Sequence, residues 1–300
     1  MRSTDGRATR ARTSRPARAV AAIASRPQDW ADRQDAASHS GVAVDWWRRY
    51  RAIEGPLQSI LLTAYVFLAV FPAMLVLDEY LQRDPAALTN HIVSRYGLSS
   101  ATADTLRGVL FRDETHKLGT AVIAIGGALL FGLGFGRVLQ LVYARTWRIE
   151  LKSKATDQGR YAVVLLVLVA LVVLLLVQTT ELAGTPAWDE DALAFGWFAL
   201  LVGYFVWAPR LLTHRQISAR DLLPGAALTA FGIVALFLVS SFLLATWIDF
   251  YSKDYGGLGV VMALFFWLGF GSTIIVASAS LAPALAGRRE LLRARAADRD

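Results

Sequence analysis

The sequence predicts an all-α, polytopic membrane protein with six transmembrane helices. Of its 300 residues, 55% are hydrophobic and only 18% are charged, which gives a mean hydropathy of +0.42. This balance excludes an ordinary water-soluble enzyme. A helix needs roughly 20 apolar residues to cross a bilayer, and six uncharged runs are near or above that length. These runs cover residues 55–77, 118–136, 161–180, 192–209, 222–248 and 255–287.

Three domains follow from these runs. A disordered basic tail of residues 1–44 comes first, because its first 26 residues hold seven arginines against Asp5 alone. The transmembrane domain covers residues 45–288, and a second basic tail covers 289–300. The chain contains no cysteine, which excludes disulfides, thiolate metal sites and a thiol nucleophile. The expected spans are about 57–77, 118–140, 161–180, 192–209, 223–248 and 257–282.

The distribution of Lys and Arg predicts the orientation. The segments on the side of the two termini hold 24 basic residues and the segments on the other side hold 6, whereas the acids divide evenly. By the positive-inside rule, both termini and both tails lie in the cytoplasm. The expected partners are membrane lipids, with anionic head groups at the cytoplasmic face. The first tail lacks interleaved aromatics, so no specific nucleic acid is expected. A homo-oligomer is left open.

The first span ends in the run from Ala64 to Pro72, and Pro72 predicts a kink near the outer surface. The outer segment 78–117 follows. Its apolar residues recur at helical spacing, as in Leu88, Ile92 and Val93. We therefore expect two short amphipathic helices along the outer leaflet.

The second span is expected to pack centrally. It carries small residues at a strict four-residue spacing, which lets helix backbones approach closely. Arg137 is the only charged residue inside a span. Two readings are open: this arginine reaches the head-group zone, or it faces a cytoplasmic cavity and holds an anionic group such as a lipid phosphate. The third span, rich in Leu and Val, is expected to face lipid. The small residues of the second span are Ala124, Ala128, Gly132 and Gly136.

The last two spans meet at a glycine-rich outer turn. Two interpretations stay open for this turn. Its aromatics form an interfacial belt, or they ring an outer opening to a path between helices. Gly259, Ala263 and Gly271 continue a stripe of small residues into the sixth span. The candidate pathway residues at this turn are Asp249, Tyr251, Tyr255 and Trp267.

Over residues 45–290 the chain resembles the YihY/BrkB family of bacterial inner-membrane proteins, once labelled ribonuclease BN. The resemblance is carried by the run Ala64 to Pro72, by Leu223-Pro224-Gly225-Ala226, and by Tyr251, Tyr255, Gly256 and Gly259 followed by Trp267. It implies a plasma-membrane location, no cofactor and a role in envelope lipid or amphiphile traffic. The family usually has a Gly-Ala-Glu type sequence late in the sixth span. This chain has Ala277-Ser278-Ala279-Ser280 there, without the carboxylate.

The function we expect is handling or translocation of lipid or another amphiphile across the inner membrane. A nuclease needs converging His and carboxylate groups. The topology places His39 and His214 on one side of the membrane and His91 and His116 on the other. We therefore expect no enzyme activity and no catalytic or metal site. The alternatives are a non-transporting membrane scaffold and, disfavoured, a ribonuclease BN-like tRNA-processing enzyme.

Overall fold

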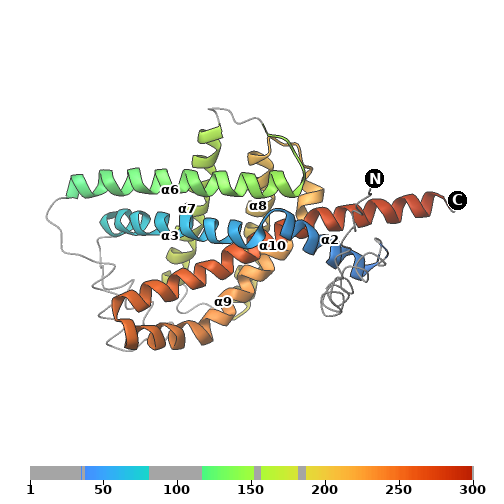
Figure 1. Ribbon diagram of the computed structural model, residues 1–300. Helices are drawn as coiled ribbons and strands as arrows, with labels where there is room; N and C mark the ends of the chain where they lie inside the picture. Colours follow the sequence, from blue (N-terminus) through green and yellow to red (C-terminus); the bar gives the residue numbers. More distant parts are fainter. Residues whose placement is uncertain (1–34, 36–37, 81–116, 152–156, 182–186, 299–300) are drawn as a thin grey trace, which may run out of the picture.

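The computed structural model describes residues 35, 38–80, 117–151, 157–181 and 187–298 (Figure 1). All regular structure in these residues is helical. A short helix, α2 (His39–Ala52), is followed by the long helix α3 (Gly55–Tyr80). The remaining helices are α6 (Lys117–Thr146), α7 (Asp157–Glu181), α8 (Ala187–Leu212), α9 (Ala219–Tyr255) and α10 (Gly257–Ala297). Each of the six predicted spans lies within one of the helices α3 and α6 to α10.

Three helices of the described part are long and apolar enough to cross a membrane. The qualifying stretches are Ala194–Leu212 in α8, Ala219–Ser240 in α9 and Leu258–Ala297 in α10. A fourth is added if α2 and the first part of α3 are counted as one span, although these two helices are bent by 60°. An apolar helix of this length buries its surface most favourably in lipid. Six membrane crossings, with both termini in the cytoplasm, remain a prediction.

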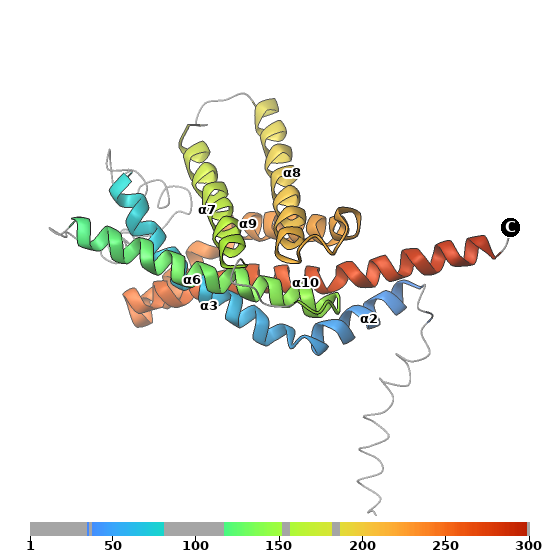
Figure 2. The same ribbon diagram turned by 90° about the horizontal axis from the view of Figure 1, so that it is seen from above.

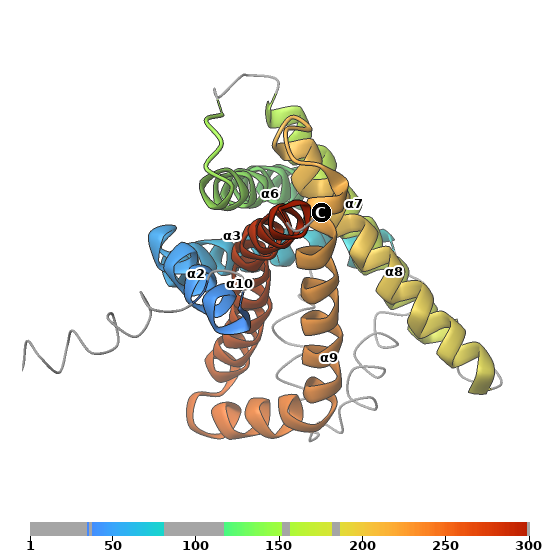
Figure 3. The ribbon, with the colours of Figure 1, turned by 90° about the vertical axis from the view of Figure 1, so that its right-hand side faces the viewer.

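The helices do not form one parallel bundle. α3 contacts α6 and α10, and the three run side by side (Figure 1). α7 and α8 form an antiparallel pair that crosses these helices steeply, and their far ends stand away from them (Figure 2). α9 runs straight and then bends sharply before it reaches α10 (Figure 3). The largest buried core therefore lies where α3, α6, α7, α8, α9 and α10 come together, around Leu139, Val142, Val164 and Leu212.

Glycines of α6 set its distance from two neighbours. A methyl group at Gly136 would lie 2.7 Å from Cβ of Tyr161, and one at Gly132 would overlap Leu165. These two positions of the predicted stripe therefore pack against α7, while Gly134 packs against Tyr65 of α3. The side chains of Ala124 and Ala128 lie outside the described residues.

α9 and α10 approach closely at both ends of their contact. Next to Gly256, which has a positive φ of 56°, a methyl group at Gly259 would overlap the carbonyl of Tyr251. At the other end, a methyl group at Gly225 would lie 2.8 Å from Cβ of Ala282. Ala263 is buried between the two helices, whereas Gly271 has ordinary space.

The residues that the structure describes begin before residue 45, the predicted start of the transmembrane domain. The hydroxyl of Ser38 accepts the Gly41 N–H at 2.9 Å and caps α2, which begins at His39. Residues 1–34, the amphipathic helices predicted within 78–117 and the side chain of Pro72 lie outside the described residues. α3 continues as a helix through position 72. The kink stays a prediction.

Candidate functional site

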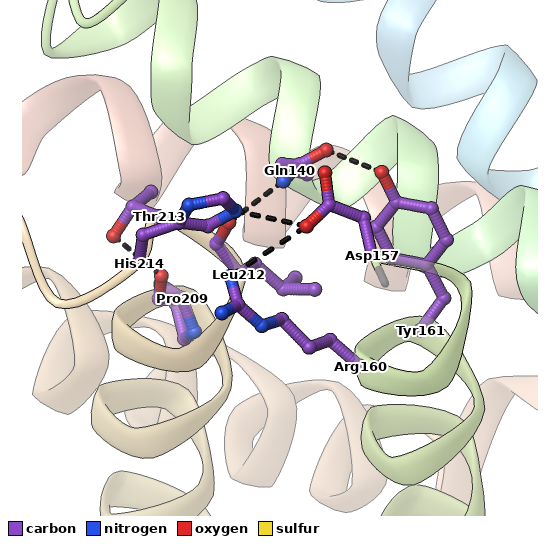
Figure 4. A network of polar contacts seen from close by, with 8 residues as sticks. All are labelled: Gln140, Asp157, Arg160, Tyr161, Pro209, Leu212, Thr213 and His214. Carbon is purple, nitrogen blue, oxygen red and sulfur yellow. Dashed lines mark hydrogen bonds and ion pairs between the residues drawn. The ribbon is translucent and has the colours of Figure 1, made fainter. Parts of the chain in front are cut away.

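Polar side chains from three helix ends meet at one place in the structure (Figure 4). We call this cluster the polar junction, and it comprises Gln140, Asp157, Arg160, Tyr161 and His214. The end of α6, the start of α7 and the end of α8 supply these residues. All three helix ends border the arginine-rich connections that the sequence places in the cytoplasm. The junction therefore gathers buried and partly buried polar groups near the predicted inner surface.

The end of α8 places His214 in the junction. After Leu212 the chain leaves the helix with two residues of positive φ, His214 at 55° and Arg215 at 61°. The Arg215 N–H bonds to the Arg210 carbonyl at 2.7 Å and closes the helix end. Non-glycine residues in this conformation cost about 1 kcal/mol each. The contacts of the junction offset this cost.

Asp157 is the buried acid of the junction. It is the first residue of α7, and only 2% of its side chain is exposed. His214 Nε2 lies 2.9 Å from its Oδ1, and Arg160 Nη1 lies 3.6 Å from the same oxygen. The start of a helix favours a carboxylate because the helix dipole is positive there. The two basic side chains and the helix start together stabilise a charge that burial alone would disfavour.

Gln140 joins the other two helices of the junction. Its Nε2 donates a hydrogen bond to the Leu212 carbonyl at 2.7 Å, which satisfies one of the last carbonyls of α8. Its Oε1 accepts a hydrogen bond from the Tyr161 hydroxyl. These two hydrogen bonds connect α6 to α8 and to α7. The described residues contain no group of three or more His, Asp or Glu suited to a metal ion.

The predicted site residues fall into two separate groups. Arg137 is exposed, and it follows Gly136, which packs against Tyr161 of the junction. Asp249, Tyr251, Tyr255 and Trp267 lie instead around the turn between α9 and α10, at the other end of α9 (Figure 3). The structure thus places Arg137 beside the polar junction and apart from the predicted outer residues.

An aromatic cluster holds two of the four outer residues. The ring of Trp247 lies 6.1 Å from that of Trp267 and 6.5 Å from that of Tyr251. Tyr255 is exposed, and Asp249 is half-buried. Ring pairs at these distances stabilise the contact between α9 and α10. This geometry accounts for Tyr251 and Trp267 as packing residues. The interfacial belt and the path between helices both stay predictions.

By the predicted topology Asp157 and His214 lie on the same side of the membrane, but no motif gives either residue a role. They are 57 residues apart, and no spacing rule connects them. The one usable signal is that each borders a predicted span on the basic side, where an acid and a histidine among basic residues are candidates for pairing.

Comparison with known proteins gives one match. The family model described as Virulence factor BrkB matches residues 46–300, which is nearly all of the chain after the N-terminal tail. No curated protein matches the chain, and no solved structure does. The resemblance seen in the sequence is therefore confirmed by the family comparison.

Proposed function

The chain belongs to the BrkB family, and with this membership and its membrane-length apolar helices as the premise, we propose that it handles lipid or another amphiphile in the bacterial inner membrane. Family membership and the apolar helices support an integral membrane protein. The finer proposal is movement of the amphiphile across the bilayer, with both termini in the cytoplasm.

The observation that carries the proposal is the chemistry of the buried helix surfaces. Asp157 is the one charged side chain among the buried residues of the described part, and it lies at a helix start. Several buried hydroxyls bond back to their own helices. Thr63 donates to the Ser59 carbonyl at 2.7 Å, and Thr229 donates to that of Gly225 at 2.9 Å. Such hydroxyls leave little hydrogen-bonding capacity for a polar solute.

A carrier of small polar solutes needs several polar or ionisable groups near the middle of the membrane. An amphiphile makes a smaller demand, because its acyl chains stay in lipid and only its head group needs polar contacts. In the described part of the chain the buried charged side chain, Asp157, lies at a helix start and not in the middle of a helix, which suits the second kind of cargo.

Large apolar side chains on the outside of the helices support the same proposal. Phe195, Phe231 and Phe242 are 73%, 64% and 80% exposed. Contiguous exposed apolar surface is costly in water, and it becomes favourable when lipid covers it. The helices that carry these residues, α8 and α9, therefore offer surfaces to acyl chains.

Transbilayer movement of a labelled phospholipid tests the proposal. The purified full-length chain is reconstituted into liposomes, and a membrane-impermeant reductant quenches the label in the outer leaflet. We expect quenching to go beyond the outer-leaflet fraction in protein-containing liposomes and not in protein-free ones. Arg137→Ala is expected to slow the movement. Quenching that stops at the outer-leaflet fraction would favour the non-transporting scaffold.

A further inference from the structure

A second polar feature lies apart from the junction, between the start of α9 and the end of α10. Here the two helices enclose a pocket of about 370 Å³. We call it the basic pocket. Arginines dominate its charge, and two apolar side chains complete its wall. Its lining residues are Ser218, Arg220, Asp221, Leu223, Ala286, Arg289, Glu290 and Arg293.

The helical repeat of α10 turns two of these arginines toward α9. Arg289 and Arg293 are four residues apart and share one face of the helix, which also carries Ala286. Arg288 and Arg295 are seven residues apart and lie on the opposite face. The end of α10 therefore carries two pairs of arginines with different surroundings.

The two pairs differ in their partners. Arg295 forms a bidentate contact with Asp35 at 2.8 and 3.0 Å, and Arg288 lies 3.3 Å from His39. In contrast, no ion pair or hydrogen bond joins the guanidinium groups of Arg220, Arg289 and Arg293 to the described part of the chain. Arg288 and Arg295 therefore connect the end of α10 to the segment that contains Asp35 and His39. The arginines of the pocket are available to an anion.

The charges of the pocket fit an anion that carries one negative charge. Three guanidinium groups face two carboxylates, and Asp221 is occupied because it accepts the Ser218 hydroxyl at 2.6 Å as part of the α9 cap. The start of α9 adds a positive helix dipole. Guanidinium groups bind phosphate oxygens in pairs of parallel hydrogen bonds. The net charge of the pocket matches that of a phosphodiester.

The position of the pocket favours a lipid over a soluble phosphate. The uncharged run of α10 ends at Gly287, directly after the pocket residue Ala286, and the uncharged run of α9 begins at Leu222. The pocket therefore lies where both helices leave the apolar layer. Leu223 is half-exposed beside it and offers an apolar contact to the first part of an acyl chain.

We propose that the basic pocket binds the phosphodiester head group of an anionic phospholipid in the leaflet at the arginine-rich end. This inference rests on the proposed function, since it names the head group that the protein would hold. Arg289 and Arg293 bind the phosphate oxygens. Glu290 opposes binding by its negative charge and limits the affinity.

Lipid retention by purified protein tests the assignment. The full-length chain is reconstituted in nanodiscs that contain phosphatidylglycerol and phosphatidylcholine, extracted into mild detergent, and examined by native mass spectrometry for bound phosphatidylglycerol. We expect the double variant Arg289→Ala, Arg293→Ala to lower its apparent affinity by about tenfold or more. Glu290→Gln is expected to raise it.

The matched control is the double variant Arg288→Ala, Arg295→Ala, which removes the same charge from the opposite face of α10. It is expected to change the affinity by less than about twofold. Equal losses in both double variants would overturn the proposal, because binding would then follow net charge only. An unchanged affinity in the pocket variant, with a wild-type elution profile, would overturn it as well.

Two further measurements distinguish a lipid head group from a soluble phosphate, and lipid binding from lipid movement. Displacement of phosphatidylglycerol by millimolar inorganic phosphate would assign the pocket to a soluble phosphate and overturn the lipid assignment. Retention is measured without transbilayer movement, so a pocket that binds lipid in a protein that moves none leaves this inference standing and removes the proposed function. Transbilayer movement without retention of phosphatidylglycerol would leave the proposed function standing and overturn this inference.

Discussion

Gly259 is the position where the smallest change of side chain has a clear structural consequence. A methyl group there would overlap the backbone carbonyl of Tyr251, which cannot move without shifting α9. We expect Gly259→Ala to destabilise the protein by about 1–3 kcal/mol, as overpacking does elsewhere. Thermal unfolding in detergent measures the change.

Gly271 offers the control, because a methyl group there would lie 3.7 Å from Leu236, an ordinary contact. Gly271→Ala is expected to unfold at or slightly above the wild-type temperature, since alanine favours the helix. A similar loss in both variants would contradict the close approach described for Gly259.

Asp157 is the residue on which the polar junction depends. Asp157→Asn keeps the shape but removes the charge that faces His214 and Arg160. We expect a loss of about 1.5–3 kcal/mol in unfolding free energy, the value of hydrogen bonds to charged groups. Denaturant titration in detergent measures it.

Asp45→Asn is the matched control for this loss. Asp45 pairs with Arg49 at 2.8 Å, but its side chain is 45% exposed. The control is expected to cost less than about 1 kcal/mol, as exposed ion pairs do. A cost as large as that of Asp157→Asn would show that burial of the junction is not what gives it strength.

At the residue scale, the sequence predicted close helix packing at positions where small residues recur at a four-residue spacing. The four-residue repeat marked Gly132 and Gly136, and both meet α7. The pairing of Asp157 with His214 was beyond prediction, because it depends on how two loops far apart in the chain come together. Arg137 was noted for its charge, and its place beside the junction came from the structure.

At the scale of elements, α2 is attached to the last helix by a side chain. Trp46 Nε1 donates a hydrogen bond to the Ala277 carbonyl of α10 at 2.9 Å. Trp46→Phe keeps most of the ring and removes the donor, so we expect a loss of about 0.5–1.5 kcal/mol in unfolding free energy. Denaturant titration measures it.

Trp47→Phe supplies the comparison for Trp46. Trp47 is half-exposed and lies under Arg51 at 5.6 Å. Its replacement is expected to change the unfolding free energy by less than that of Trp46. The reverse order would indicate that the bond to Ala277 contributes little.

The sequence predicted each long helix because an uncharged run of about 20 residues has few other stable conformations. It did not predict the bend of α9 or the steep crossing of α7 and α8 (Figures 2 and 3). Helices that are apolar on all sides carry little information about which face packs inward. Crossing directions depend on the fit of neighbouring side chains, which a single sequence does not reveal.

At the scale of the whole molecule, the predicted orientation can be tested because the chain has no cysteine. Gln216→Cys places a thiol in the connection between α8 and α9, and Lys253→Cys places one near the turn between α9 and α10. Both positions are exposed. In intact cells, a membrane-impermeant maleimide that has access to the periplasm is expected to label Lys253→Cys only.

Permeabilisation of the inner membrane is expected to make Gln216→Cys reactive as well. Labelling of Gln216→Cys but not of Lys253→Cys in intact cells would reverse the predicted orientation and contradict the prediction from the positive-inside rule. Labelling of both variants in intact cells would show that α9 does not separate the two compartments.

The hydrogen bond from Trp46 to Ala277 spans 231 residues of chain, and this distance has a consequence during synthesis. The ribosome releases the first helix long before it makes the last one. Until Ala277 emerges, the indole of Trp46 has no native acceptor. A chain truncated before residue 277 therefore cannot form this hydrogen bond between α2 and α10. We expect membrane proteases to degrade such a product.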